Sequence, residues 1–282
     1  MLDLNVYGVA LYRRMSFYPL LSWAAAAAYA ALAVRGWRLT RQGVVWQHWR
    51  SWVLLPLLVH AGALSHSIFT GQQFNLGLGN TVSAIGWLVV LVPWLAGGRY
   101  ALASLSWLVL PVAGVASVLG LLPVAHWFSY PLNSAFGWHL PLALLAYSLF
   151  VIAALYGLLL QMLTRALHHP IQAVWAQHLP PLLTIEALLF RTLSVGFFLL
   201  TLTLATGVAF SAAWFGHAWG WTHKTVFGVL SWLIFAALLW GRYRHGWRGR
   251  VALRWLWAGC ASLLLAYVGS KFVLEVILQR LS

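Results

Sequence analysis

The chain has 282 residues, of which 62% are hydrophobic and only 7% are charged, and its mean hydropathy is +0.84. Soluble domains carry about 25% charged residues, so the composition excludes an ordinary soluble domain and indicates a multi-pass membrane protein. The formal net charge of +14 does not indicate a nucleic-acid partner, because arginines in membrane proteins report topology and contact anionic lipid head groups.

Eight apolar stretches bounded by Arg, Gly and Pro predict eight transmembrane helices, since about 20 apolar residues cross a bilayer as a helix. In chain order they cover residues 17–34, 51–69, 80–97, 100–120, 138–163, 187–211, 225–240 and 253–276. The connections are too short for a soluble domain, so we expect an all-α polytopic bundle that forms a single transmembrane domain over residues 1–282. The first stretch is expected to remain as a helix rather than to be a cleaved signal peptide, because Arg35, Arg38 and Arg41 follow it directly.

Basic residues are divided unevenly between the two sides of these helices. With the N-terminus outside, twelve arginines fall on the inner side and five basic residues on the outer side. The positive-inside rule therefore predicts both termini on the outer side of the membrane. In this topology the segment "WFGHAWGWTHKT" (214–225) is an outer loop between the sixth and seventh helices.

His60 lies nine residues past the start of the second predicted helix, which is about 13 Å along a helix that rises about 1.5 Å per residue. A polar group at this depth is costly unless it has a partner, and it points to a function. Two interpretations stay open: a metal or cofactor ligand, or a hydrogen bond to a serine or a carbonyl on another helix.

Four more histidines fall on the predicted outer side. His126 precedes the fifth predicted helix and His139 lies at its start, whereas His217 and His223 follow the sixth. Neutral imidazole is a good ligand for iron, zinc and copper. A closed zinc site is poorly supported, because this side offers no cysteine and only two acidic residues, Asp3 and Glu275. Haem suits the side better, since it needs one or two axial imidazoles, flat apolar walls, and cations for its propionates.

The segment 214–225 offers such walls and such a cation. Trp214, Trp219 and Trp221 are flat and apolar, and Lys224 follows them directly. The alternative is that these tryptophans form only an interfacial belt, which is common in membrane proteins and is a serious alternative in a chain with 19 tryptophans.

Several longer segments resemble the cytochrome c assembly membrane proteins, the superfamily that contains the CcsA, CcmC and HemX/YpjD-type proteins. The most specific are "LPPLLTIEALLFR" (179–191), "GFFLLTLTLATG" (196–207), "GRYRHGWRGR" (241–250) and "AYVGSKFVLE" (266–275), with looser matches in "HAGAL" (60–64) and "WHLPLALLAYSLFVIAALYGLLLQ" (138–161). The resemblance to the HemX/YpjD type covers nearly the whole chain.

The segment 214–225 is similar to the tryptophan-rich WWD signature of this superfamily, which ends in Trp-x-Trp-Asp-Pro-Lys. Trp219, Trp221 and Lys224 match, whereas Thr222 and His223 stand where the signature has Asp and Pro. The resemblance implies an outer platform for haem b, with His139 as an axial ligand and Lys224 near a propionate. His223 is a candidate second ligand, because it lies inside the signature.

The chain also departs from the superfamily pattern. The last segment, "EVILQRLS" (275–282), has no histidine to match the second outer ligand of CcsA. Trp240 lies near the place of the membrane histidine that follows the signature, and His60 is only a loose match to the remaining one. These differences favour a reduced, HemX-like haem-binding or regulatory protein over a complete CcsA-type haem relay.

The resemblance thus implies a haem-binding inner-membrane protein that holds haem for handling, delivery or regulation, with an apocytochrome or other cytochrome assembly proteins as partners. Two alternatives remain open: a membrane transporter or permease for haem or another solute, and a haem-free assembly factor. An enzyme is not expected, because the sequence shows neither a pair of acid and base residues nor a nucleotide-binding motif.

Overall fold

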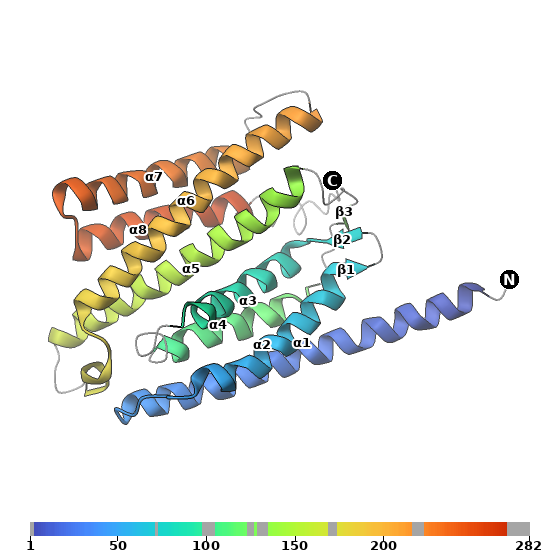
Figure 1. The fold of residues 1–282 in the computed structure, drawn as a ribbon, viewed down its shortest axis with the longest axis horizontal. Helices are drawn as coiled ribbons and strands as arrows, with labels where there is room; N and C mark the ends of the chain where they lie inside the picture. Colours follow the sequence, from blue (N-terminus) through green and yellow to red (C-terminus); the bar gives the residue numbers. More distant parts are fainter. Residues whose placement is uncertain are drawn as a thin grey trace. The chain divides into compact units, whose positions relative to one another are not determined.

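The computed structural model describes residues 3–70, 73–97, 105–122, 127–128, 135–168, 174–215 and 223–269. Within these residues there are eight α-helices, each at the place in the chain where one was predicted (Figure 1). They are α1 Asp3–Arg41, α2 Trp49–Ile68, α3 Leu78–Ala96, α4 Ser106–Leu119, α5 Ala135–His168, α6 Leu182–Phe215, α7 His223–His245 and α8 Gly249–Leu264. A π-helical turn, Leu265–Gly269, continues α8.

Six of the helices in the described part of the chain are long and apolar enough to cross a membrane: Phe17–Arg41, Trp49–Ile68, Leu78–Ala96, Trp138–Ala166, Leu182–Ala209 and His223–His245. α4 has 14 residues, fewer than the about 20 needed to span the hydrocarbon core. α8 has 16 residues and is continued by the 5 residues of the π-helical turn. The structure therefore confirms an all-α polytopic membrane protein. The count of eight spans and the outer position of both termini stay predictions.

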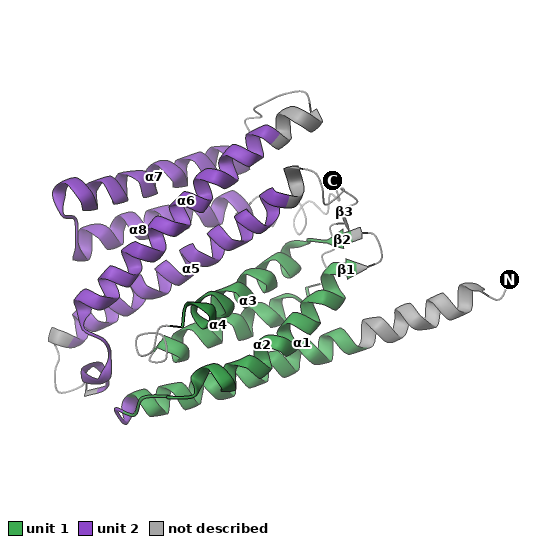
Figure 2. Cartoon of the chain, viewed as in Figure 1, with its two compact units in different colours: residues 1–40, 44–129 green, residues 41–43, 130–282 purple. Residues whose placement is uncertain are grey.

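The chain divides into two compact units (Figure 2), and each is described by itself. Unit 1 comprises Met1–Thr40 and Val44–Ser129, and unit 2 comprises Arg41–Gly43 and Tyr130–Ser282. The expectation of a single transmembrane domain over residues 1–282 stays a prediction.

Unit 1 contains α1 to α4, which pack around apolar side chains such as Tyr29, Val53 and Leu110. Small residues allow α3 and α4 to approach closely, because a Cβ atom on Gly86 would lie 2.2 Å from the Cβ atom of Ala116. Close approach through small residues is the usual way in which membrane helices pack, since apolar side chains gain little by leaving lipid for protein.

Unit 1 also contains three short strands, which the prediction of an all-helical chain missed. β1 (Phe69–Thr70), β2 (Gln73–Asn75) and β3 (Trp127–Phe128) form an antiparallel sheet in the order β1-β2-β3. Strands of two or three residues leave no alternating hydrophobic pattern in the sequence, so the periodicity that identifies strands could not reveal them.

Unit 2 contains α5 to α8. Phe150 of α5 stacks on Phe235 of α7, with ring centroids 4.2 Å apart, and Gly259 of α8 lies directly against the Phe235 ring. Contacts between the start of α5 and the end of α6, and between the start of α6 and the end of α7, make these three helices successively antiparallel. The N-terminal ends of α5 and α7 therefore share one end of the unit with the C-terminal end of α6 (Figure 1).

Candidate functional site

His139 lies in the first turns of α5, and its imidazole contacts α6. The Nδ1 atom is 3.1 Å from the hydroxyl oxygen of Thr206, and the His139 side chain is partly buried. Gly207, the next residue, leaves room for the ring, because a Cβ atom at that position would lie 3.2 Å from Cε1 of His139. The ends of two predicted membrane helices thus hold this imidazole in one orientation.

The hydroxyl of Thr206 also determines which nitrogen of His139 carries the proton. Its single hydrogen is donated within α6, to the carbonyl oxygen of Leu202 at 2.8 Å or to that of Thr203 at 3.1 Å. The Thr206 oxygen therefore accepts a hydrogen bond from Nδ1–H of His139, so Nε2 carries the lone pair. This tautomer, assigned from the hydrogen-bond network, has the form of a metal-binding histidine, whose other ring N–H is usually held by a fixed acceptor.

His223 and Lys224 form the first turn of α7, at the same end of unit 2 as His139. Both residues are exposed, and Lys224 lies within electrostatic range of the His139 imidazole. An imidazole and an ammonium group at one helical end can together receive a ligand that contains both a metal ion and an anionic group. The structure thus brings His139 and Lys224, two of the predicted site residues, to the same end of unit 2. His223 precedes Lys224 at the start of α7.

The expected outer loop over residues 214–225 is shorter than predicted. Trp214 belongs to the last turn of α6, and His223 to Thr225 belong to α7. The prediction ended the sixth helix at residue 211, although the following Ala-Ala-Trp-Phe sequence (212–215) contains nothing that stops a helix. Trp219, Trp221 and His217 lie outside the described residues, as does His126, and so does the side chain of Trp214.

His60 belongs to unit 1, where it is completely buried in α2. Its Nε2 atom is 2.9 Å from the hydroxyl oxygen of Ser83 in α3, and the Tyr29 ring approaches it edge-on at 5.8 Å. Neither Nδ1 of His60 nor the hydroxyl of Tyr29 has a hydrogen-bond partner among the residues that the structure describes. The contact with Ser83 is the helix-to-helix hydrogen bond that was one of the two interpretations of His60, and a role as ligand stays a prediction.

Sequence reasoning missed three residues that hold these histidines: Ser83, Thr206 and Gly207. Thr203 and Thr206 are three residues apart on α6, so they lie on the same face of an otherwise apolar helix. Polar residues on one face of a membrane helix indicate a polar neighbour. That spacing was the signal that could have pointed to a partner for His139.

Groups of three or more His, Cys, Asp or Glu residues that could hold a metal ion do not occur within the part of the chain that the structure describes. The chemistry of the site at the end of unit 2 therefore has to be argued from single imidazoles. An iron ion in a porphyrin needs only one or two axial ligands from the protein, since the macrocycle supplies the other four.

Comparison with known proteins is consistent with the features above. The sequence profile of the family described as "Cytochrome C assembly protein" matches residues 45–278. The inner membrane protein YpjD of Escherichia coli K12 is 43% identical over 54 residues, which are 19% of this chain and 20% of the relative. The cytochrome c biogenesis protein CcsA of Gloeobacter violaceus is 34% identical over 68 residues, which are 23% of this chain and 20% of the relative. The chain thus spans about a fifth of the length of these curated relatives.

Proposed function

Because the chain belongs to the cytochrome c assembly protein family, we propose that it binds haem b in the bacterial inner membrane for handling, delivery or regulation. The observation that carries the proposal is the 3.1 Å contact between Nδ1 of His139 and the Thr206 hydroxyl. With Nδ1–H donated to this hydroxyl, Nε2 carries the lone pair. An oriented neutral imidazole is the group that an axial haem ligand requires.

The residues around His139 fit the other parts of a haem molecule. Lys224 is within electrostatic range of His139, so its ammonium group can donate a hydrogen bond to a propionate. Such a charge-assisted hydrogen bond is about twice as strong as a neutral one. Trp214, Trp219 and Trp221 are proposed as the flat walls, because they match the tryptophan-rich signature of the family.

His223 is proposed as the ligand on the opposite face of the haem, since it lies at the start of α7 beside Lys224. When haem is bound, its iron supplies the redox-active and ligand-binding centre. If His139 is the only protein ligand, one coordination position stays open, which suits a protein that passes its haem to an apocytochrome or to another assembly protein. Two ligands would instead suit a protein that retains or senses haem.

His60 is the second proposed haem contact, at a place separate in the chain from the His139 site. Its free nitrogen is Nδ1, because Nε2 is engaged by Ser83. Since the Ser83 hydrogen bond explains the burial of His60 without any ligand, His139 is the stronger of the two proposals.

A non-enzymatic role is part of the proposal. Glu186, the acidic residue whose side chain the structure describes, accepts hydrogen bonds from two arginines and is thereby committed to an ion pair.

We also propose that both termini and the His139 site lie on the outer, periplasmic side. In unit 2 the arginines of the α7–α8 turn lie at the opposite end from His139 and Lys224, as the positive-inside rule requires of an inner surface. Tags on both ends should be cleaved by protease added to intact spheroplasts, whereas a tag in the α7–α8 turn should be protected. Protected ends would overturn the proposed orientation.

Haem content is the direct test of the proposed function. Protein purified in detergent from haem-replete cells should show a pyridine haemochrome spectrum of haem b, with about one haem per chain. A colourless preparation would contradict the proposal and would favour the alternative of a haem-free assembly factor. Solute flux through proteoliposomes without bound haem would favour the transporter alternative instead.

A further inference from the structure

The turn between α7 and α8 carries far more positive charge than the chain can neutralise. Five arginines fall between residues 242 and 254, whereas the whole chain has only three acidic residues. Glu186 of α6 is the acidic residue that contacts this turn, through Arg242 and Arg248. The turn therefore has an excess of positive charge that a partner can use.

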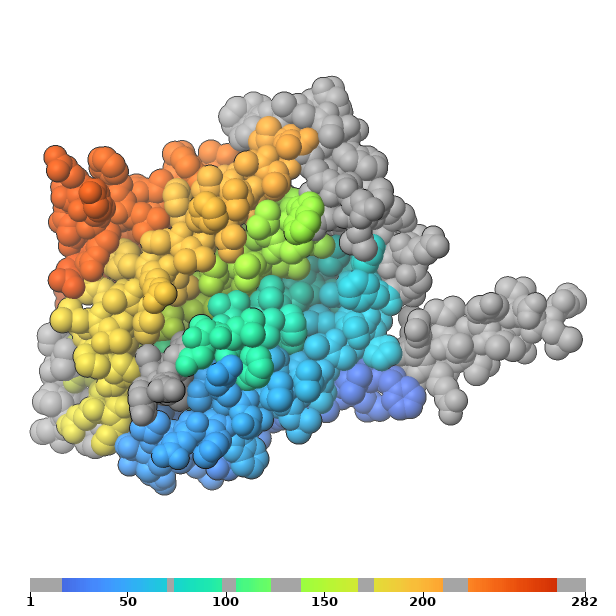
Figure 3. Space-filling model, viewed as in Figure 1, coloured from blue at the N-terminus to red at the C-terminus, as the bar shows by residue number. Residues whose placement is uncertain are grey.

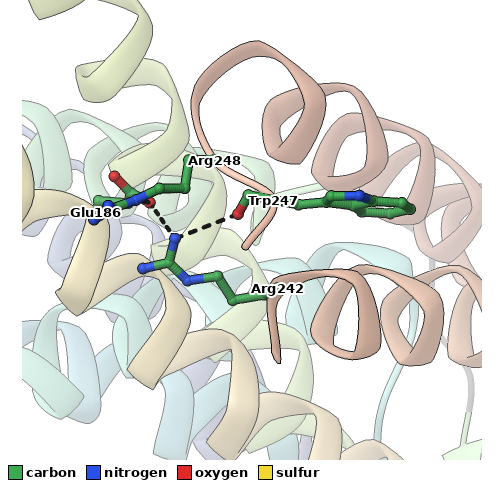
Figure 4. Close-up of polar contacts among 4 residues, drawn as sticks. All are labelled: Glu186, Arg242, Trp247 and Arg248. Carbon is green, nitrogen blue, oxygen red and sulfur yellow. Dashed lines mark hydrogen bonds and ion pairs between the residues drawn. The ribbon is translucent and has the colours of Figure 1, made fainter. Parts of the chain in front are cut away.

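Glu186 binds two guanidinium groups with one oxygen atom. Nη1 of Arg242 is 2.8 Å and Nε of Arg248 is 2.9 Å from Oε1 of Glu186, whose side chain is only 6% exposed (Figure 4). The Arg248 side chain is 54% exposed. Because Arg248 reaches Glu186 through Nε, it can present its terminal nitrogen atoms to a second anion.

Aromatic contacts hold the turn in a defined conformation. The guanidinium of Arg242 lies over the Phe190 ring at 4.6 Å and donates to the carbonyl oxygen of Trp247 at 3.4 Å. The Trp247 indole stacks on Trp255 at 5.4 Å, and it packs directly against Gly241, where no larger residue would fit. The arginines thus project from an ordered base, which reduces the entropy lost when they bind a ligand.

The remaining arginines of the turn are exposed, and so are apolar side chains beside them; the turn itself lies at the surface in Figure 3, in dark orange. Arg244 and Arg250 are exposed, and their neighbours Tyr243 and Val251 are 86% and 43% exposed. Guanidinium groups bind phosphate through paired N–H donors. A partner that meets both the charge and the apolar surface at a helix end has an anionic head group and an acyl chain.

We propose that the α7–α8 turn is a binding site for an anionic phospholipid. The phosphate of the head group is held by Arg244, Arg248 and Arg250, and the glycerol and upper acyl chains lie against Tyr243 and Val251. Glu186 is a positioning residue that holds Arg242 and Arg248 in place without neutralising both. Binding stabilises the folded protein, because the lipid binds the native α7–α8 turn.

The test compares thermal unfolding of the full chain in nanodiscs of phosphatidylcholine with and without phosphatidylglycerol. We expect phosphatidylglycerol to raise the unfolding midpoint by about 3 °C for the wild-type chain. The double variant Arg244→Gln, Arg250→Gln should lose most of this rise while keeping the wild-type midpoint in phosphatidylcholine, because neither residue contacts Glu186.

The matched control is Arg35→Gln, Arg50→Gln, which removes the same charge from unit 1. Arg35 lies over the Trp46 and Trp52 rings, and Arg50 lies over Trp94, so we expect the full stabilisation by phosphatidylglycerol to remain. An equal loss in both double variants would show a non-specific effect of net charge and would overturn the proposal. An equal rise in phosphatidylcholine on addition of about 10 mM inorganic phosphate would show that a free anion is sufficient and would overturn the lipid as ligand.

Glu186→Gln provides a second, independent test. Loss of the carboxylate leaves Arg242 and Arg248 without their anionic partner, so the midpoint in phosphatidylcholine should fall. Phosphatidylglycerol should recover part of that loss, because its phosphate pairs with the Arg248 guanidinium that Glu186 no longer holds. An equal fall in both lipids would mean that the cluster only joins α6 to the turn, and the proposal would be wrong.

Discussion

His139 and His60 each contact a hydroxyl group on a neighbouring helix, but they do so through opposite nitrogen atoms. In unit 2, His139 uses Nδ1 to contact Thr206 and leaves Nε2 for a ligand. In unit 1, His60 uses Nε2 to contact Ser83 and leaves Nδ1, the nitrogen nearer to its own backbone. A histidine next to a hydroxyl group thus leaves Nε2 without this contact in unit 2 and Nδ1 without it in unit 1.

The surroundings of His60 and His139 also differ, in burial and in nearby charge. His60 is completely buried between α2 and α3, whereas His139 is partly buried at a helix end with Lys224 in electrostatic range. A haem site needs access, and it needs a cation for the propionates. The comparison supports the proposal that His139 binds haem, whereas the hydrogen bond of His60 joins two helices.

Replacement of each histidine by alanine should give the largest difference between the two units. His139→Ala should lower the haem content of the purified protein at least about tenfold, because axial ligation by a protein imidazole is lost. His60→Ala should keep most of the haem. Haem content is measured by pyridine haemochrome assay on equal amounts of folded protein, and loss of haem only in His60→Ala would reverse the assignment.

Removal of the Thr206 hydroxyl should weaken haem binding about 10- to 100-fold, the range found when a second-shell partner of a metal ligand is lost. Thr206→Val keeps the side-chain shape but cannot accept the hydrogen bond from Nδ1–H of His139. Thr206→Ser should restore binding. Thr203→Val is the matched control, since the Thr203 hydroxyl bonds only to Leu199 in its own helix. Equal binding by Thr206→Val and the wild type would refute the proposed tautomer control.

Lys224→Gln should lower haem affinity about fivefold without any change in the absorption maxima, because Lys224 acts on a propionate and not on the iron. Lys224→Arg should retain most of the affinity, since it keeps the positive charge. Titration of the apoprotein with haem measures the affinity. A shifted Soret band in Lys224→Gln would mean that Lys224 affects the ligand set.

Ser83→Ala should lower the free energy of unfolding by about 1–3 kcal/mol, because it leaves Nε2 of His60 buried without a partner. The absorption spectrum and haem content should stay as in the wild type. Ser65→Ala is a suitable control, since the Ser65 hydroxyl is exposed and bonds only to Gly62 in its own helix. A change in the spectrum with unchanged stability would show instead that His60 binds the iron.

The helices could be predicted because each is a long apolar run, but their ends could not. α1 continues to Arg41 and α7 to His245, through the arginines at which the prediction stopped. Arginine has a high helix propensity, and long basic side chains can reach the lipid head groups from within a helix. An apolar run therefore marks the membrane core and underestimates the helix.

Individual residues of the site could be predicted from the sequence, but the contacts that hold them could not. His139 and Lys224 were singled out by their position and by the family signature, and the structure brings them to the same end of unit 2. The partners of the histidines were missed, because Thr206 is 67 residues from His139 and Ser83 is 23 residues from His60 in the chain. The spacing of Thr203 and Thr206 indicates a polar neighbour of α6 but not which residue it is, and only the packing of the helices decides which hydroxyl meets which nitrogen.

The central claim is that haem is bound at the end of unit 2 by His139, with His223 on the opposite face. Its most direct test is the visible absorption spectrum of the detergent-purified double variant His139→Ala, His223→Ala. We expect the Soret band of the wild type to be lost or clearly shifted, because both proposed axial imidazoles are absent. A full haem complement with an unchanged Soret band in this variant would contradict the claim and would place the iron ligand elsewhere, with His60 as the first residue to test.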